Sequence, residues 1–209
     1  MEGAPAARLS VTPVTGPELL AAIPDLARLR MGVFRAFPYL YEGSAGYEEA
    51  YLRTYAEAPG ALVALARDGE RVVGASTALP LVQETPDIQR PFLAAEQRRE
   101  FDVARILYLG ESVLLPEYRG QGLGHLFFDV REAHARALGL TVCTFCAVQR
   151  PADHPATPPG YRSLGAFWHA RGYQERPDLQ TELSWQDVGE AGESPKPMRF
   201  WVRRLIPQG

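Results

Sequence analysis

The sequence has only two cysteines among its 209 residues, so no disulfide framework can hold the fold together. It also lacks any apolar run close to the roughly 20 residues that a membrane-spanning helix needs. Its first residues, MEGAPAARLSVTP, include no apolar segment of the kind found in a signal peptide. We therefore expect a cytoplasmic protein that is stabilised by its hydrophobic core.

A strong excess of charge of one sign is absent as well. Lysine and arginine number 22, and aspartate and glutamate 25, which gives a formal net charge of −3. This balance provides no basic surface for nucleic acid or for an anionic membrane, and we expect neither as a partner. The four histidines, at positions 125, 134, 154 and 169, show no spacing typical of a metal site, so we expect no metal.

What the sequence does have is the composition and element order of a mixed α/β domain. Hydrophobic residues make up 46% and charged residues 22%, as in most globular proteins. The patterns predict one domain over 1–209 with a polar, partly helical insertion at 82–104. The predicted helices follow Pro17, Ser44 and Gly124, with a short one at 161–171. The predicted strands are 9–14, 61–66, 72–79, 106–115, 141–148, 180–185 and 198–206.

The most informative segment is LLPEYRGQGLG, residues 114–124, between a predicted strand and an amphipathic helix. The first turn of a helix presents unpaired N–H groups that bind anions, and glycines let the anion approach the backbone. With the charge of Arg119, the segment predicts a phosphate or pyrophosphate site. Its glycine spacing fits neither the dinucleotide fingerprint nor the P-loop. The alternative is a glycine-rich helix start that binds nothing.

Residues 116–124 resemble the Arg/Gln-x-x-Gly-x-Gly/Ala signature of the GNAT superfamily of acyl-CoA N-acyltransferases, through Arg119, Gly122 and Gly124. Residues 165–173, GAFWHARGY, resemble the Phe-Tyr-x-x-x-Gly-Phe helix of that family. The resemblance implies a single GNAT-like domain in which helices flank a mixed, splayed central sheet. It also implies acetyl-CoA as the cosubstrate.

The resemblance further implies where CoA binds. The turn would hold the pyrophosphate, and the pantetheine arm would pair with the preceding strand where that strand carries a bulge and splays from the next one. Carried over by position, the CoA-binding residues are Ser112, Val113, Leu114, Arg119, Gly120, Gln121, Gly122, Leu123, Gly124 and the main chain of His125.

Two residues are candidates for the acid–base chemistry of acyl transfer. In several family members an acidic residue at the place of Glu111 binds or deprotonates the amine, and we expect this role here. The alternative is a strand residue paired with an arginine. The family's usual general acid is the tyrosine of its Phe-Tyr pair, but this chain has Trp168, whose indole cannot deliver a proton. We expect Trp168 to pack against the pantetheine and Tyr161 to serve as the acid, with Ser163 and His169 as further candidates.

The segment 34–41 lies between the first two predicted helices, a region that covers the acceptor site in the family. We predict that Arg35, Phe37, Tyr39 and Tyr41 line a substrate pocket, the alternative being a satellite of the core. In the proline-rich loop that follows the strand 141–148, Arg150, His154 and Arg162 are candidates for an anionic group of the substrate. A solvated loop is the alternative reading.

Two further patterns concern strands. Cys143 and Cys146 have redox spacing but fall within a predicted strand, where residues three apart point to opposite faces, so we expect two buried small side chains. The last predicted strand, 198–206, alternates charge and bulk. This pattern favours a half-exposed strand able to pair with a second subunit, which makes a homodimer an open expectation.

The sequence thus predicts an N-acetyltransferase that moves an acetyl group from acetyl-CoA to the amine of a small molecule, by direct transfer in a ternary complex. One alternative is a CoA-binding sensor or interaction domain without catalysis, suggested by Trp168. Another is a transferase for a longer acyl group. The identity of the acceptor amine does not follow from the sequence.

Overall fold

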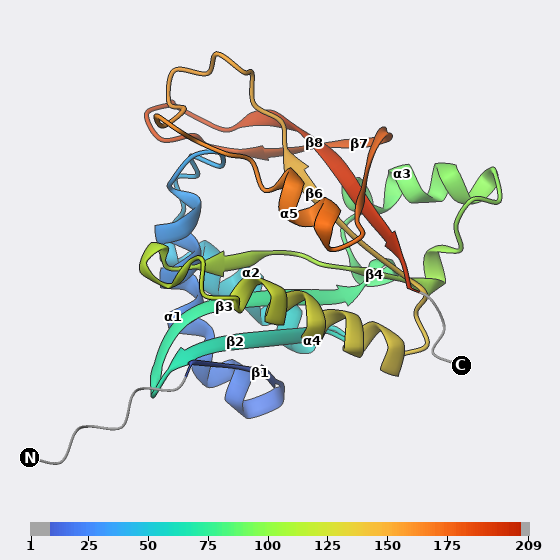
Figure 1. Ribbon diagram of the computed structural model, residues 1–209, viewed down its shortest axis with the longest axis horizontal. Helices are drawn as coiled ribbons and strands as arrows, with labels where there is room; N and C mark the ends of the chain where they lie inside the picture. Colours follow the sequence, from blue (N-terminus) through green and yellow to red (C-terminus); the bar gives the residue numbers. More distant parts are fainter. Residues whose placement is uncertain (1–8, 206–209) are drawn as a thin grey trace, which may run out of the picture.

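An eight-stranded sheet runs through the computed structural model, which describes residues 9–205 (Figure 1). The strand order is β1-β2-β3-β4-β6-β8-β7, and β5 pairs with β3 beside β4. Only β4 and β6 are parallel; every other pairing is antiparallel. The strands are β1 (Leu9–Val14), β2 (Leu62–Asp68), β3 (Arg71–Pro80), β4 (Ile106–Tyr108), β5 (Ser112–Leu114), β6 (Val142–Val148), β7 (Gln174–Trp185) and β8 (Ser194–Arg204).

Helices cover both faces of this sheet, which confirms the predicted mixed α/β class (Figure 1). On one face, apolar side chains of α1, α2 and α3 pack on the strands, and on the other face those of α4 and α5 do so. The helices are α1 (Gly16–Phe34), α2 (Ala45–Glu57), α3 (Pro86–Gln97), α4 (Leu123–Ala137) and α5 (Gly165–Ala170), with short 3₁₀ turns η1 (Leu81–Gln83), η2 (Val103–Arg105) and η3 (Pro116–Tyr118). None of the helices within residues 9–205 is long and apolar enough to cross a membrane.

The predicted insertion at 82–104 is part of the core. Its main element, α3, places Ile88, Phe92 and Ala95 against β8 and the start of β4. The hydroxyl of Thr181 on β7 donates a 2.7 Å hydrogen bond to the main-chain oxygen of Asp87. The segment therefore covers one half of the sheet.

The C-terminal third of the chain differs most from the prediction. The helix predicted at 161–171 is shorter, because α5 begins only at Gly165, and β7 begins at Gln174, earlier than predicted. Along the last strand, buried side chains are mixed with more exposed ones such as Arg204, but β8 is not an edge strand: it pairs with β6 along one edge and with β7 along the other. Since both edges carry hydrogen bonds within the chain, a second subunit cannot add a strand to β8. Its arginines find partners instead, as Arg199 does with Glu175.

The two cysteines lie within β6, buried and free, as predicted. Cys143 packs with the α4 side of the core and Cys146 with the α2 and α3 side. Burial raises the pKa of each thiol to about 12, which keeps both uncharged.

Candidate active site

A β-bulge separates β4 from β5 and shapes the centre of the site. Leu79 pairs with Tyr108 and Ser76 with Ser112, so three steps along β3 face four steps along the neighbouring chain. The extra residue is accommodated at Thr77, whose main chain accepts from the N–H of Gly110 and donates to the oxygen of Glu111, each at 3.1 Å. An extra residue of this kind bends a strand and redirects its side chains. The strand predicted as continuous over 106–115 is thus two strands with a bulge between them, as the resemblance implied.

Beyond the bulge the sheet opens between β5 and β6. β4 pairs with β6 through residues 106–108, and the N–H of Leu109 makes one more hydrogen bond, 2.7 Å, to the oxygen of Thr144. β5 then follows β3. On β6 the exposed fraction rises from 0–3% at residues 142–144 to 8–9% at residues 145–148. The sheet therefore splays at the place that the resemblance assigns to pantetheine.

The edge of β5 that faces this gap carries main-chain groups with which no other strand among residues 9–205 pairs. Hydrogen bonds from Thr77 N–H to the oxygen of Glu111, and from Leu115 N–H to the oxygen of Val73, point toward β3. Because the direction alternates along a strand, Val113 also faces β3, whereas Ser112 and Leu114 face the gap. The oxygen of Leu114 accepts long hydrogen bonds, 3.4 Å, from the guanidinium of Arg119. Of the three predicted strand residues, Ser112 and Leu114 can thus pair with a ligand, and Val113 packs its side chain under α1.

The glycine-rich turn ends where α4 begins. Gly120 and Gly122 have φ values of +74° and +84°, a region that favours glycine, and Gly122 is the N-cap of α4. In the part of the chain that the structure describes, no hydrogen bond uses the N–H groups of residues 120–124. This cluster of free donors at a helix N-terminus suits an anion. The main chain of His125 was expected among the CoA-binding groups, but its N–H already donates to the oxygen of Gly122 at 2.9 Å.

Helix α5 packs against this turn through Phe167. A Cβ on Gly124 would lie 3.5 Å from the ring of Phe167, and the ring of His125 meets it edge-on at 4.9 Å between centroids. Trp168 instead packs against Phe145 and Trp201, each at 5.0 Å. The structure thus places Phe167 beside the turn and Trp168 against β6 at the start of the splay. The sequence motif contained both residues, but their different neighbours were not predicted.

The carboxylate of Glu111 points to the opposite face of the sheet, toward α1 and α2. It forms an ion pair with Arg30, which also pairs with Glu48, and the hydroxyl of Tyr41 donates a 2.6 Å hydrogen bond to Glu48. The main chain of Glu111 is held separately: its N–H donates to Thr77 Oγ1 at 3.2 Å. Arg30 and Glu48 were not predicted, since nothing local links them to position 111.

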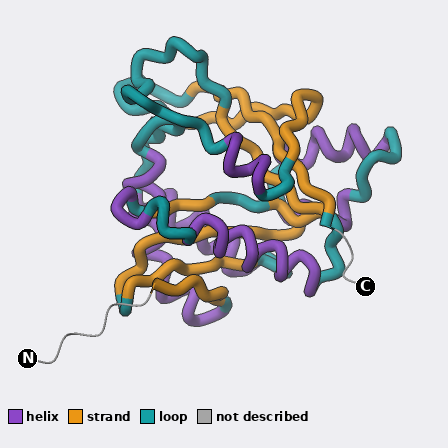
Figure 2. The backbone as a smooth tube through the Cα atoms, in the orientation of Figure 1, coloured by secondary structure: helices purple, strands orange, loops and turns teal. Residues whose placement is uncertain are grey.

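The loop of residues 35–44 is fixed to two other loops at one end of the molecule (Figure 2). Arg150 makes a two-pronged ion pair with Asp187, at 2.7 and 2.9 Å, and donates to the main-chain oxygens of Pro38 and Tyr39, at 2.8 and 2.7 Å. Each of its three donor nitrogens is therefore engaged within the chain, which favours a role of Arg150 in fixing these loops over the binding of a substrate anion. Trp185 donates to the same oxygen of Tyr39 at 3.0 Å.

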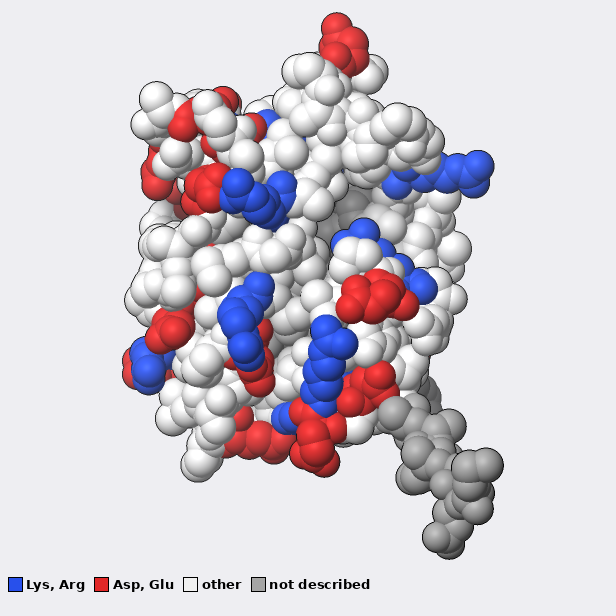
Figure 3. All heavy atoms as spheres, turned by 90° about the vertical axis from the view of Figure 1, so that its left-hand side faces the viewer, with Lys and Arg blue, Asp and Glu red and all other residues white. Residues whose placement is uncertain are grey.

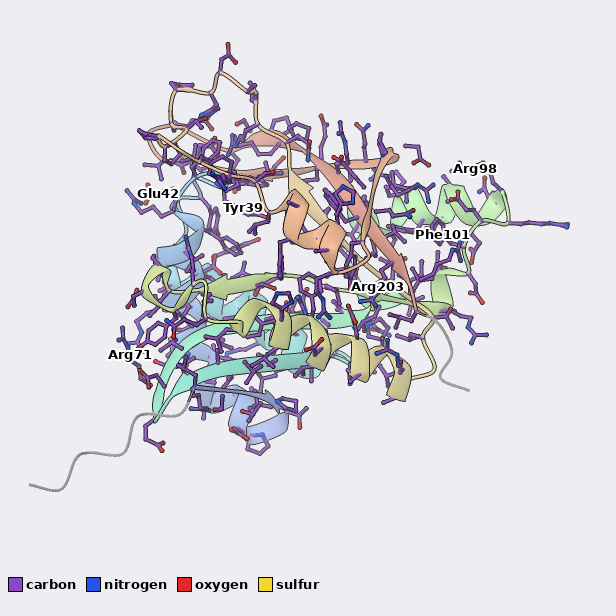
Figure 4. The ribbon with its side chains drawn as sticks, viewed as in Figure 1. Tyr39, Glu42, Arg71, Arg98, Phe101 and Arg203 are labelled. Carbon is purple, nitrogen blue, oxygen red and sulfur yellow. The ribbon has the colours of Figure 1, made fainter. Side chains whose placement is uncertain are left out.

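The four predicted pocket residues have different environments. Tyr39 packs on Phe34, with centroids 4.8 Å apart, and belongs to the edge of the core; burial raises its pKa. Tyr41 is half-buried beside Glu48, and burial together with this hydrogen bond raises its pKa. Arg35 is exposed and pairs with Glu42. Tyr39 and Glu42 lie at the same end of the molecule as Arg71 of the β2–β3 hairpin (Figure 4).

The predicted acid, Tyr161, lies in a loop before α5. The residue is 40% exposed, and its ring meets the ring of Phe37 edge-on, with the centroids 4.7 Å apart. His154 joins the same cluster, 5.7 Å from Phe37. Partial burial raises the pKa of Tyr161, so its phenol remains protonated at neutral pH. The structure brings Tyr161 to the predicted substrate loop, and the other candidates, Ser163 and His169, are exposed.

A group of buried phenols beside the bulge was not predicted as part of the site. A Cβ on Gly110 would lie 2.4 Å from the hydroxyl of Tyr55, which donates a 2.8 Å hydrogen bond to Glu84. The hydroxyl of Tyr108 lies 3.2 Å from the sulfur of Cys146. Burial raises the pKa of Tyr51 to about 12 and that of Tyr55 well above its ordinary value, so these phenols stay neutral. The sequence showed Tyr51 and Tyr55 only as the apolar face of a helix.

Charge is mixed around this end of the molecule. Figure 3 shows basic and acidic side chains interspersed over the face that lies at the left of Figure 1. No broad basic surface faces the viewer there.

Comparison with known proteins identifies the same family over a longer part of the chain. The model of the Acetyltransferase (GNAT) family matches residues 25–165, more than half of the chain. No curated protein matches this chain. Among solved structures, the ribosomal-protein-alanine N-acetyltransferase from Brucella melitensis has 16% identity and a TM-score of 0.60, covering 94% of this chain and 99% of that one.

Two other solved structures share the fold. An acetyltransferase from Thermus thermophilus has 18% identity and a TM-score of 0.56, with 96% of this chain and 99% of that chain covered. The Salmonella typhimurium protein yncA, solved with its cofactor acetyl-CoA, has 12% identity and a TM-score of 0.57, with 95% of each chain covered. At these identities the likeness concerns the fold.

Proposed function

The chain belongs to the GNAT acetyltransferase family, and from this premise we propose that it transfers an acetyl group from acetyl-CoA to the amine of a small molecule. The transfer is direct, within a ternary complex. Support for direct transfer comes from the cysteines, the strongest nucleophiles among the side chains. Both are buried, with the pKa of each raised to about 12, so neither supplies a thiolate for a covalent intermediate.

The residues of the gap and the turn fit CoA. The free N–H groups of residues 120–124 and the charge of Arg119 would hold the pyrophosphate. The main-chain groups of Ser112 and Leu114 would pair with the amides of the pantetheine arm. When bound, acetyl-CoA supplies the activated acyl group.

Two groups of the chain act on the reacting atoms in this proposal. The N–H of Leu114 faces the gap and would donate to the thioester carbonyl oxygen, on which negative charge develops, which leaves the oxygen of Leu114 and the main chain of Ser112 for the pantetheine amides. Glu111 would accept the proton of the amine, directly or through one water, as the C–N bond forms. The C–S bond of the thioester breaks, and CoA leaves as a thiolate that takes up a proton from water. Its carboxylate lies on the α1 and α2 face, so the amine enters from the side of Tyr41 and the loop of residues 35–44.

The observation that carries the proposal is the splay between β5 and β6, with free donors on β5 leading to free donors in the turn. Isothermal titration with CoA and acetyl-CoA tests it. We expect micromolar binding with a stoichiometry of one, which Arg119→Gln weakens. Absence of binding at high micromolar CoA would refute the proposal.

A panel of acceptors then tests the chemistry through thiol release. The panel contains primary amines, amino acids and, because one structural neighbour is a ribosomal-protein-alanine N-acetyltransferase, a peptide with an N-terminal alanine. Acetyl-, propionyl- and succinyl-CoA are compared with the best acceptor to test the acyl group. CoA binding without thiol release for any acceptor would favour the alternative, a CoA-binding domain without catalysis, to which the indole of Trp168 points.

A further inference from the structure

Arg30 on α1 is buried between two carboxylates from distant parts of the chain. Its guanidinium pairs with Glu48 on α2 and with Glu111 in the bulge. The three side chains are 10%, 0% and 8% exposed, respectively. A buried charge is costly unless it is paired, so this arrangement fixes all three side chains relative to one another.

The position of Arg30 is fixed from several directions. The guanidinium carbon lies 4.4 Å from the ring centre of Tyr51 and 5.2 Å from that of Phe34. Glu48 is itself held by the hydroxyl of Tyr41 at 2.6 Å. The chain of contacts therefore runs from the substrate loop through Glu48 and Arg30 to Glu111.

Glu111 keeps one oxygen for another partner. The ion pair with Arg30 uses Oε2, and among residues 9–205 no hydrogen bond reaches Oε1. Two carboxylates share one guanidinium, so the three ionised side chains carry a net charge of −1. An amine with its proton would meet that remaining charge and the free oxygen.

We propose that Arg30 is a positioning residue for Glu111, and that Glu48 holds Arg30 in place. The proposal rests on the proposed function, since it assigns Glu111 the proton of the amine. The bulge fixes the main chain of Glu111, and Arg30 sets the rotamer in which Oε1 faces the acceptor. A displacement of about 1 Å at a reacting group can cost about 100-fold in rate.

The test compares Arg30→Gln, Arg30→Lys and Glu48→Gln with the wild type. Arg28→Gln is the matched control, because Arg28 lies on the same helix, is 72% exposed and pairs with Asp25. Steady-state rates are measured with the best amine of the panel and normalised to the concentration of acetyl-CoA sites from titration. We expect Arg30→Gln to lower kcat per site about 100-fold and to leave the Kd of acetyl-CoA unchanged. Arg28→Gln should have the kcat per site and the Kd of the wild type. Arg30→Lys recovers part of the rate, because an ammonium can still pair with Glu111.

The double variant Arg30→Gln/Glu111→Gln separates positioning from mere structure. If Arg30 acts through Glu111, the double variant has the kcat of Glu111→Gln alone, because residues that act as a unit are not additive. A purely structural role would instead lower the number of acetyl-CoA sites and leave kcat per site intact, which overturns the proposal. If Arg30→Gln fails to fold, the test rests on Glu48→Gln and Arg30→Lys. A wild-type kcat per site in both of these variants would overturn the positioning role of Arg30. Wild-type protein without turnover refutes the proposed function, and the positioning role with it.

Discussion

The guanidinium of Arg131 donates a 3.1 Å hydrogen bond to the main-chain oxygen of Glu111. Arg131 comes from α4, on the face of the sheet opposite to Arg30, and also donates to the oxygen of Phe127 at 3.1 Å. Burial lowers its pKa to about 10, which leaves it charged at neutral pH. One arginine thus fixes the backbone of Glu111 from one face, and another holds its carboxylate from the other.

Glu111→Gln tests the role of this carboxylate. Glutamine keeps the shape of the side chain but cannot take a proton, so kcat should fall about 10²–10⁴-fold, the usual contribution of a general base. The Kd of acetyl-CoA, measured by titration, should stay unchanged because CoA contacts main-chain groups in our proposal. Glu182→Gln on β7 serves as the control. Wild-type kcat in Glu111→Gln would exclude Glu111 as the base.

Two glycines of the turn should respond differently to alanine. Gly122 has φ +84°, so Gly122→Ala forces an L-residue into the left-handed region at a cost of about 1–2 kcal/mol. At position 124 the added Cβ would make ordinary contact with Phe167 at 3.5 Å. We expect a lower Tm and weaker CoA binding for Gly122→Ala, and a Tm near that of the wild type for Gly124→Ala. Equal Tm values for the two variants would contradict this account of the turn.

Gly43 should be intolerant because of Tyr41. A Cβ on Gly43 would lie 2.6 Å from Cε1 of Tyr41 and 3.3 Å from Oε1 of Glu48, so Gly43→Ala displaces the ring from its hydrogen bond with Glu48. Gly46, on the same stretch of chain, has nothing within 4 Å, and Gly46→Ala should stabilise α2 by roughly 0.5–1 kcal/mol. Amine KM and kcat should change only in Gly43→Ala. Unchanged kinetics in Gly43→Ala would mean that Tyr41 and Glu48 do not affect the site.

Asp187 should give stability that depends on pH. Burial would raise its pKa, but the ion pairs with Arg150 and Lys196 outweigh burial and lower it. A carboxyl with a lowered folded-state pKa stabilises the fold above its unfolded value, about 4, and loses this contribution as the pH falls through the folded value. At pH 7, Asp187→Asn should cost on the order of 3 kcal/mol, because Arg150 remains buried without its carboxylate.

Urea unfolding of the wild type and Asp187→Asn at pH 7, 5 and 3 measures this difference. The gap between their free energies of unfolding should be full at pH 7 and narrow between pH 5 and 3. Asp25→Asn is the control, since its exposed pair with Arg28 should contribute at most about 1 kcal/mol. A gap that stays constant over this range would show that the ionised carboxylate contributes nothing.

The sequence predicts those parts of the site that depend on neighbours along the chain. The turn is an example, because positive φ at Gly120 and Gly122 and a helix start are local properties. The pairing of Arg30 with Glu111 joins residues 81 positions apart, and no local pattern reports it. In the sequence Arg150 is a candidate for a ligand or for a solvated loop, because an arginine in a loop has no visible partner until the fold brings Asp187 beside it.

Strand boundaries failed for a similar reason. The start of β7, QERPD, is polar and contains Pro177, a pattern that favours a loop. It forms a strand because β8 offers it hydrogen bonds, with an irregularity between Arg176 and Gln180. Tertiary pairing outweighs local preference there.

The bulge also changes which side chains of this segment, the even-numbered or the odd-numbered ones, face α1, α2 and α3. Before it, the even-numbered Ile106 and Tyr108 face these helices, and after it the odd-numbered Glu111 and Val113 do. Deletion of Gly110 would leave the sequence of apolar residues in β4 and β5 unchanged. It would, however, shift the register of β5 against β3 by one residue. Either Glu111 or the edge that presents Ser112 and Leu114 to the gap would then turn to the wrong side. The proposed acid–base group and the proposed CoA-binding edge are therefore compatible within one strand only through that one additional residue.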